Sequence, residues 1–151
     1  TVNIALVENG KPILGVIYVP VSNFMYYASS VGAFKEVNKE NHKLPLYNNN
    51  KVYKVVGSRS HSSIETEKFI DELKKDKGEI EIVYIGSSLK ICLVAEGSAD
   101  VYPRFAPTME WDTAAGHAIV NKSGKKLIDL TTKNEMIYNR KKLKNNWFIV
   151  K

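Results

Sequence analysis

Residues 86–116 read GSSLKICLVAEGSADVYPRFAPTMEWDTAAG and carry most of the polar chemistry that points to a function. Their pattern predicts two helices, at residues 88–96 and 111–121, separated by a strand at residues 99–102. Glycines and prolines mark the places where one element gives way to the next. An alternation of strands and helices is typical of the α/β class.

The segments on either side extend this pattern. Five further elements are predicted there, namely strands at 53–57, 81–85, 127–130 and 147–150 and a helix at 63–75. Ser62 and Glu65 have the spacing of a capping box, which predicts where that helix begins. We therefore expect residues 50–151 to form a C-terminal α/β domain with a mixed sheet.

The first 49 residues are expected to form antiparallel sheet. Asn9-Gly10 is a two-residue hairpin signal, because both central positions of a type I′ turn require a positive φ. Four strands are predicted around this turn and those that follow, at residues 2–7, 12–19, 24–28 and 33–37. The polar run from Asn38 to Asn50 is interpreted as a linker. Residues 1–49 are therefore assigned to the remaining antiparallel strands of an N-terminal sheet domain.

Composition restricts the class of protein. The chain has 151 residues, of which 44% are hydrophobic and 25% charged, as in a globular protein with a proper core. No apolar run approaches the roughly 20 residues of a membrane-spanning helix, so no span is predicted. The single cysteine, Cys92, lies in an apolar run and is interpreted as core. Without an internal disulfide a cytoplasmic location is expected, and peripheral membrane association is left open.

The formal net charge is +6, which favours anionic partners. Much of the excess lies near the C-terminal end, at Lys122, Lys125, Lys126, Lys133, Arg140, Lys141, Lys142 and Lys144. Tyr138 and Trp147 flank this cluster, but stacking residues are not regularly interleaved in it. We interpret the cluster as solvated surface and expect no nucleic-acid partner.

Residues 86–90 follow a predicted strand and open a predicted helix, so they are expected to form a phosphate seat. Ser87 has two interpretations, a plain helix N-cap or a direct contact with the anion. Lys90 would place a cation in the first helical turn, where it opposes the helix dipole. An anionic ligand would compensate for that charge, and a lysine that extends into solvent is the alternative.

Arg104 and His61 are predicted at the same edge of the sheet. Arg104 is placed just past the strand at 99–102, at the carboxyl end where ligands bind in open α/β sheets, and its planar fork suits phosphate. A surface salt bridge is the alternative role. His61 follows the strand at 53–57 and could contact a phosphate or a base, although an isolated histidine is more often structural or solvent-exposed.

Asp112 lies at the start of the helix at 111–121 and has two interpretations. It could cap that helix, or it could supply one oxygen ligand to Mg²⁺, which also requires further carboxylate or phosphate oxygens. The sequence shows no second acidic cluster with ligand spacing, and no zinc motif, dinucleotide-binding fingerprint or Walker motif.

Four segments together resemble a known family in order and in spacing. They lie at residues 85–90, 92–97, 102–108 and 111–118. They resemble the CysQ-type 3'(2'),5'-bisphosphate nucleotidases of the inositol monophosphatase superfamily, and the resemblance extends over essentially the whole chain. Residues 111–118 resemble the second signature of this superfamily.

The resemblance implies a layered α/β/α/β/α sandwich, α/β in class and α+β in part, and a Mg²⁺-dependent phosphatase. It implies that Asp112 is a metal ligand at the substrate site. It also implies that Ser87, Lys90 and Arg104 contact substrate phosphate or nucleotide, and that His61 lies on the nucleotide side. Relatives that act on inositol phosphates carry an acidic residue at the Arg104 position, so the arginine favours a substrate with a second phosphate.

The implied reaction removes the 3'-phosphate of adenosine 3',5'-bisphosphate to give AMP, in sulfur assimilation or nucleotide recycling. The phosphosulfate 3'-phosphoadenosine 5'-phosphosulfate is a further candidate substrate. An inositol monophosphatase-like enzyme and a non-catalytic anion-binding module remain alternatives, and a homodimer is left open. The first family signature, which supplies most metal ligands, does not occur in this sequence. We therefore expect the chain to be a C-terminal portion with no catalytic residue of its own and little activity alone.

Overall fold

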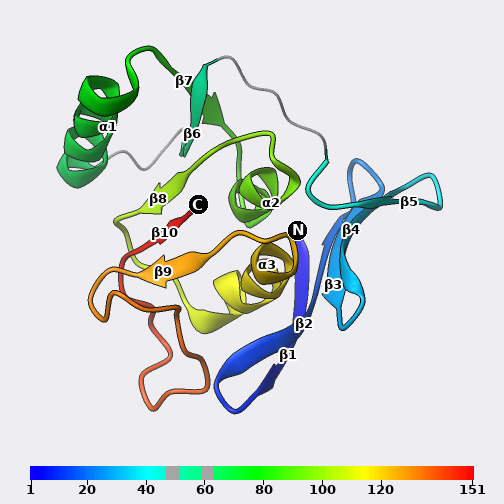
Figure 1. Cartoon of the computed structure of the whole chain (residues 1–151). Helices are drawn as coiled ribbons and strands as arrows, with labels where there is room; N and C mark the ends of the chain where they lie inside the picture. The colour runs from blue at the N-terminus through cyan, green and yellow to red at the C-terminus, as the bar shows by residue number, and fades with distance from the viewer. Residues whose placement is uncertain (47–51, 59–62) are drawn as a thin grey trace.

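The computed structural model describes residues 1–46, 52–58 and 63–151. Its first part is an antiparallel sheet in which each strand pairs with the next along the chain (Figure 1). The strands are β1 (Val2–Glu8), β2 (Lys11–Val19), β3 (Phe24–Ser29), β4 (Gly32–Val37) and β5 (Glu40–Lys43). The predicted hairpin joins β1 to β2, because Asn9 and Gly10 adopt the positive φ angles, 51° and 76°, that its turn requires.

Strand β5 corrects the prediction of a linker from Asn38 to Asn50. Residues 40–43 pair antiparallel with β4 after a turn at Asn38 and Lys39, whose φ angles are also positive, 52° and 68°. All residues of β5 are exposed, so it lacks the alternation of apolar and polar residues that marks a half-buried strand. Residues 47–51, at the end of the supposed linker, lie outside the described part of the chain.

The second sheet is mixed. Its strands are β6 (Tyr53–Gly57), β7 (Ile80–Tyr84), β8 (Tyr102–Arg104), β9 (Leu127–Asp129) and β10 (Phe148–Val150). Strands β6 and β7 are parallel, β10 pairs antiparallel with β8 and β9, and a parallel bridge from Val55 to Val101 joins the two groups. Strand β8 begins later than the predicted strand at 99–102, because Asp100 and Val101 hydrogen-bond to the Lys54 carbonyl. Arg104 therefore ends the strand and does not lie in the loop beyond it.

Helices α1 (Ile64–Lys77), α2 (Leu89–Glu96) and α3 (Glu110–Lys122) correspond to the three predicted helices. The start of α1 differs in one detail. The structure places the N-cap at Ser63, whose hydroxyl accepts a hydrogen bond from the Thr66 N–H, whereas Ser62 of the predicted capping box lies outside the described residues. Ser63 has the extended backbone that is typical of an N-cap residue.

The helices and sheets form layers (Figure 1). Helix α1 covers one face of the mixed sheet, and α2 and α3 lie between the mixed sheet and the five-stranded sheet. Small residues permit this close packing. A Cβ on Gly15 of β2 would collide with the carbonyl oxygen of Ala115, and a Cβ on Gly116 would lie 2.9 Å from the Cγ2 of Ile91. This packing explains why a glycine occupies position 116 inside α3.

The five-stranded sheet is apolar on both faces. Ile17 and Tyr26 are buried on its inner face, whereas Val2, Ile4 and Leu6 of β1 are exposed on its outer face. A solvated outer face is usually polar, so this pattern is typical of a sheet that a further layer covers. The described residues form four layers in the order α, β, α, β, in agreement with the predicted layered α/β class. The division at residue 50 stays a prediction.

Candidate functional site

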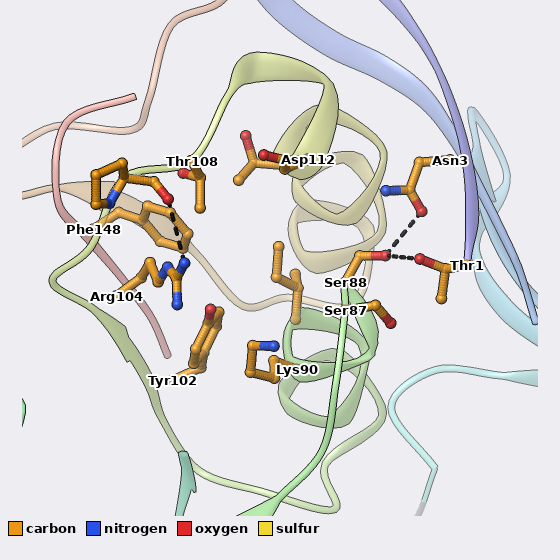
Figure 2. Close-up of a pocket in the computed structure, with 13 residues that line it drawn as sticks. Thr1, Asn3, Ser87, Ser88, Lys90, Tyr102, Arg104, Thr108, Asp112 and Phe148 are labelled. Atoms are coloured by element: carbon orange, nitrogen blue, oxygen red, sulfur yellow. Dashed lines mark hydrogen bonds between the residues drawn. The ribbon is translucent and has the colours of Figure 1, made fainter. Parts of the chain in front are cut away.

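One cavity of about 340 Å³ collects most of the predicted site residues (Figure 2). It lies between the start of β1, the N-terminal end of α2, the end of β8 and the start of α3. Its lining residues are Thr1, Asn3, Ser87, Ser88, Lys90, Ile91, Tyr102, Arg104, Pro107, Thr108, Asp112, Thr113 and Phe148. Ser87, Lys90, Arg104 and Asp112 are thus brought together, whereas His61 lies outside the described residues.

The N-terminal end of α2 opens onto this cavity. The cap position is Ser88 and not Ser87, and the Ser88 side chain makes no capping hydrogen bond to the helix. Its hydroxyl instead donates to Asn3 Oδ1 at 2.8 Å and shares a hydrogen bond with Thr1 Oγ1 at 2.8 Å. Ser87, with a φ of 52°, forms the turn before the helix. The first turn of α2 is therefore tied to β1 and left without a side-chain cap, as suits an anion-binding helix end.

Lys90 is buried in the first turn of α2, with 8% of its surface exposed. Its Nζ lies 3.5 Å from the Ile85 carbonyl oxygen and 5.8 Å from the centroid of the Tyr102 ring. Burial, and secondly the charge of Arg104, lower the pKa of the Lys90 ammonium below its usual value. Within residues 1–46, 52–58 and 63–151 it forms no ion pair. The alternative of a lysine extended into solvent is therefore excluded.

Arg104 brings a second cation to the cavity from the end of β8. Its Nη2 donates to the Pro107 carbonyl oxygen at 3.3 Å, which fixes one arm of the guanidinium. Its Nε is buried and has no hydrogen-bond partner among the described residues. An unpartnered buried donor is costly, and an anion in the cavity would satisfy it. No carboxylate in the described part of the chain pairs with Arg104, so the salt-bridge alternative finds no support there.

Asp112 is the acidic group of the cavity and lies across it from Lys90 (Figure 2). Its Oδ2 accepts a hydrogen bond from the Met109 N–H at 2.8 Å, so it helps to cap α3 from the third helical position. The described residues contain no group of three histidine, cysteine or acidic side chains that could hold a metal ion. Asp112 alone does not make a Mg²⁺ site, which requires several oxygen ligands.

The cavity therefore has two walls of opposite charge. Lys90 and Arg104 supply a cationic wall with an uncapped helix end, and Asp112 supplies a carboxylate. The cationic wall suits a phosphate group, whereas a second phosphate near Asp112 would require a cation between the two negative charges.

Several lining residues were missed by sequence reasoning. Asn3 belongs to β1 and Thr1 precedes it; both lie more than 80 positions before Ser88, and no local pattern connects them to it. Phe148 comes from the C-terminal strand, next to β8. Tyr102 shares a strand face with Arg104, but the predicted strand ended at residue 102 and left Arg104 outside it, so alternation could not connect them.

Other candidates lie outside the cavity. Cys92 is fully buried, and burial raises the pKa of its thiol, so the prediction that it belongs to the core is confirmed. His117 is buried, and its Nδ1 lies 3.0 Å from the Tyr138 hydroxyl. Burial lowers the pKa of His117 to about 4, so its ring is neutral near pH 7. No helix in the described residues is long and apolar enough to cross a bilayer.

Comparison with known proteins places the chain in a family. The profile of the inositol monophosphatase family matches residues 1–149. The chain belongs to this family. Within it, the chain is 49% identical to the 3'(2'),5'-bisphosphate nucleotidase CysQ of Salmonella typhimurium, over 82% of this chain and 48% of that protein. The predicted resemblance to CysQ-type members of the family is therefore confirmed.

Two solved structures show the family fold. A crystal structure of CysQ from Bacteroides thetaiotaomicron is 47% identical and has a TM-score of 0.92, covering 99% of this chain and 61% of that one. Inositol monophosphatase II from Staphylococcus aureus is 20% identical with a TM-score of 0.72, covering 98% and 55% of the two chains, and shows the fold alone. The chain spans about half the length of the curated relatives it matches.

Proposed function

We propose that this chain supplies the phosphate-binding part of a 3'(2'),5'-bisphosphate nucleotidase. The observation that carries the proposal is the pair Lys90 and Arg104, two cations in one cavity without a carboxylate partner among the described residues. A substrate with two phosphates matches the two walls of the cavity. The name of the Salmonella relative supports the same class of substrate.

In this proposal the phosphate that is not transferred lies against the cationic wall. Lys90, the Arg104 guanidinium and the open end of α2 at Ser87 bind it, and His61 contacts the nucleotide side by resemblance to the family. The transferred 3'-phosphate then lies toward Asp112. The substrate is adenosine 3',5'-bisphosphate and the product AMP, with 3'-phosphoadenosine 5'-phosphosulfate as a second substrate.

Mg²⁺ is the proposed cofactor, and Asp112 would be one of its ligands. The described residues supply only this carboxylate from the cavity wall, so the remaining ligands are proposed to come from residues outside them. When bound, the metal would neutralise charge on the transferred phosphate and activate the attacking water. No further step is assigned to residues of this chain, which orient the substrate.

The substitution Arg104→Glu tests the proposal in the complete protein that carries this chain. It should lower kcat/KM for adenosine 3',5'-bisphosphate about 100-fold, because a charge-assisted contact is replaced by repulsion, and should affect adenosine 3'-monophosphate far less. Arg104→Lys is the matched control, since it keeps the charge and loses only the planar fork. Equal losses on both substrates would overturn the assignment of the second phosphate to this wall.

A second measurement tests whether this chain alone can catalyse the reaction. The 151-residue chain alone is expected to release little phosphate from adenosine 3',5'-bisphosphate with Mg²⁺, as followed with malachite green, because it supplies one metal ligand. Robust turnover by the isolated chain would contradict this. A complete protein that prefers inositol monophosphate would favour the first alternative. A complete protein that binds the bisphosphate without turnover would favour a non-catalytic anion-binding module.

A further inference from the structure

Tyr102 lies at the centre of the cationic wall. It is the first residue of β8, two positions before Arg104, and both side chains line the cavity. Lys90 Nζ lies 5.8 Å from the centroid of its ring. Figure 2 shows its hydroxyl directed into the cavity, with Arg104 on one side and Lys90 on the other.

Packing accounts for the ring of Tyr102 but not for its hydroxyl. The ring meets Phe148 edge to face with centroids 5.9 Å apart, and only 5% of the residue is exposed. A phenylalanine would make the same contacts and would equally cover the Lys90 ammonium. The hydroxyl instead has the Arg104 guanidinium as a side-chain hydrogen-bond partner, a contact that neither the packing nor the cation–π contact supplies.

The hydroxyl has the chemistry of a neutral donor. Burial raises the pKa of Tyr102 to about 12, and the charge of Arg104 and its side-chain hydrogen bond offset this only in part. The phenol therefore keeps its proton at the pH values at which Lys90 and Arg104 are charged. The Arg104 guanidinium can only donate, so the hydroxyl accepts from it and keeps its own proton available for an anion in the cavity.

We propose that the Tyr102 hydroxyl donates a hydrogen bond to the phosphate that is not transferred, as a third donor beside Lys90 and Arg104. It thereby contributes to the preference for substrates with two phosphates. A terminal phosphate presents three oxygens, and the three donors line the same cavity. This inference rests on the proposed function, because it assigns the phosphate at that wall.

The test is Tyr102→Phe in the complete protein, since it removes the hydroxyl and keeps the ring. The Kd for adenosine 5'-monophosphate, measured by calorimetry, should rise about tenfold or more, and kcat/KM for adenosine 3',5'-bisphosphate should fall by a similar factor. Kinetic constants for adenosine 3'-monophosphate should not change. The thermal midpoint should not change either, which a purely structural role of the hydroxyl would not allow.

Tyr138→Phe is the matched control. Tyr138 is also a buried tyrosine, but its hydroxyl contacts His117 and it does not line this cavity. Its loss should lower stability and leave the ratio of the two substrates unchanged. If Tyr102→Phe binds adenosine 5'-monophosphate as tightly as the parent protein, the inference is overturned. If the parent protein hydrolyses neither substrate, the proposed function fails, and the calorimetric comparison still decides the role of Tyr102.

Discussion

The two ends of helix α2 each bury a charge that opposes the helix dipole, but only one end is balanced by the protein. Glu96, in the last turn, accepts hydrogen bonds from Tyr26 at 2.6 Å, Lys35 at 2.8 Å and Ser98 at 2.6 Å. Lys90, in the first turn, contacts one carbonyl oxygen at 3.5 Å and an aromatic ring. Both side chains are more than 90% buried.

The difference suggests a structural role for Glu96 and a ligand-binding role for Lys90 in the same helix. A charge that opposes the dipole costs free energy unless other groups compensate. Glu96 is compensated by groups from β3 and β4, so it fastens α2 to the five-stranded sheet. Among the described residues Lys90 has only a long contact with a carbonyl oxygen and an aromatic ring, so we propose that a bound anion compensates for its charge.

Replacing Glu96 with alanine should cause the largest loss of stability. The substitution leaves the Lys35 ammonium partly buried without its carboxylate and leaves the Tyr26 hydroxyl without an acceptor. Removal of one partner from a buried ion pair typically costs about 3–5 kcal/mol. Because Lys35 is 20% exposed, we expect the free energy of unfolding, from urea titration, to fall by about 3 kcal/mol.

Glu72→Ala is the matched control for that measurement, because Glu72 is an exposed glutamate of α1. It should change the free energy of unfolding by less than about 0.5 kcal/mol. A loss of similar size in both variants would show that Glu96 does not fasten the helix to the sheet.

Replacing Lys90 with methionine should weaken ligand binding without lowering stability. Methionine fills much of the same space and removes a buried cation that opposes the dipole, so stability should stay constant or rise. The Kd for adenosine 5'-monophosphate should rise about 10- to 100-fold, because a hydrogen bond to a charged group contributes about 1.5–3 kcal/mol. Calorimetry of the complete protein would measure this. If the variant is less stable but binds adenosine 5'-monophosphate as tightly as the parent protein, Lys90 has a structural role like that of Glu96.

The same contrast explains which parts of the fold could be predicted from sequence. Local signals predicted the hairpin at Asn9-Gly10 and the helices, because turn chemistry and apolar periodicity act over a few residues. Strand β5 was missed, since all its side chains are exposed and polar. The late start of β8 was missed too, because residues 100 and 101 bond to Lys54, which is distant in sequence.

Prediction of the site was also limited by contacts between residues that are distant in sequence. Lys90 was found because it breaks a local rule, a cation at a helix N-terminus, and Asp112 because it begins a helix. Glu96 breaks the same rule at the other end of α2, yet its partners Tyr26 and Lys35 come from strands about 60 to 70 positions earlier. Sequence alone shows the unfavourable charge, but only the fold shows whether the protein already compensates for it.

The smallest expected effect is the dependence of anion affinity on pH. Burial and the charge of Arg104 lower the pKa of Lys90, so its ammonium loses a proton at a lower pH than an exposed lysine, whose pKa is about 10.4. In the proposed site, adenosine 5'-monophosphate binds to the charged form of Lys90. The affinity for adenosine 5'-monophosphate should therefore be highest while Lys90 is charged, as at neutral pH. It should fall as the pH rises through the lowered pKa of Lys90.

The loss at alkaline pH cannot exceed that of Lys90→Met, because both remove the same charge, and it should be smaller because methionine also removes the hydrogen-bond donor. Lys90→Arg is the control, since a guanidinium stays protonated in this range and should abolish the alkaline loss. Tyr102, with a pKa of about 12, also keeps its proton there. If the arginine variant loses affinity over the same pH range, another group titrates, and the first turn of α2 does not hold the anion through Lys90.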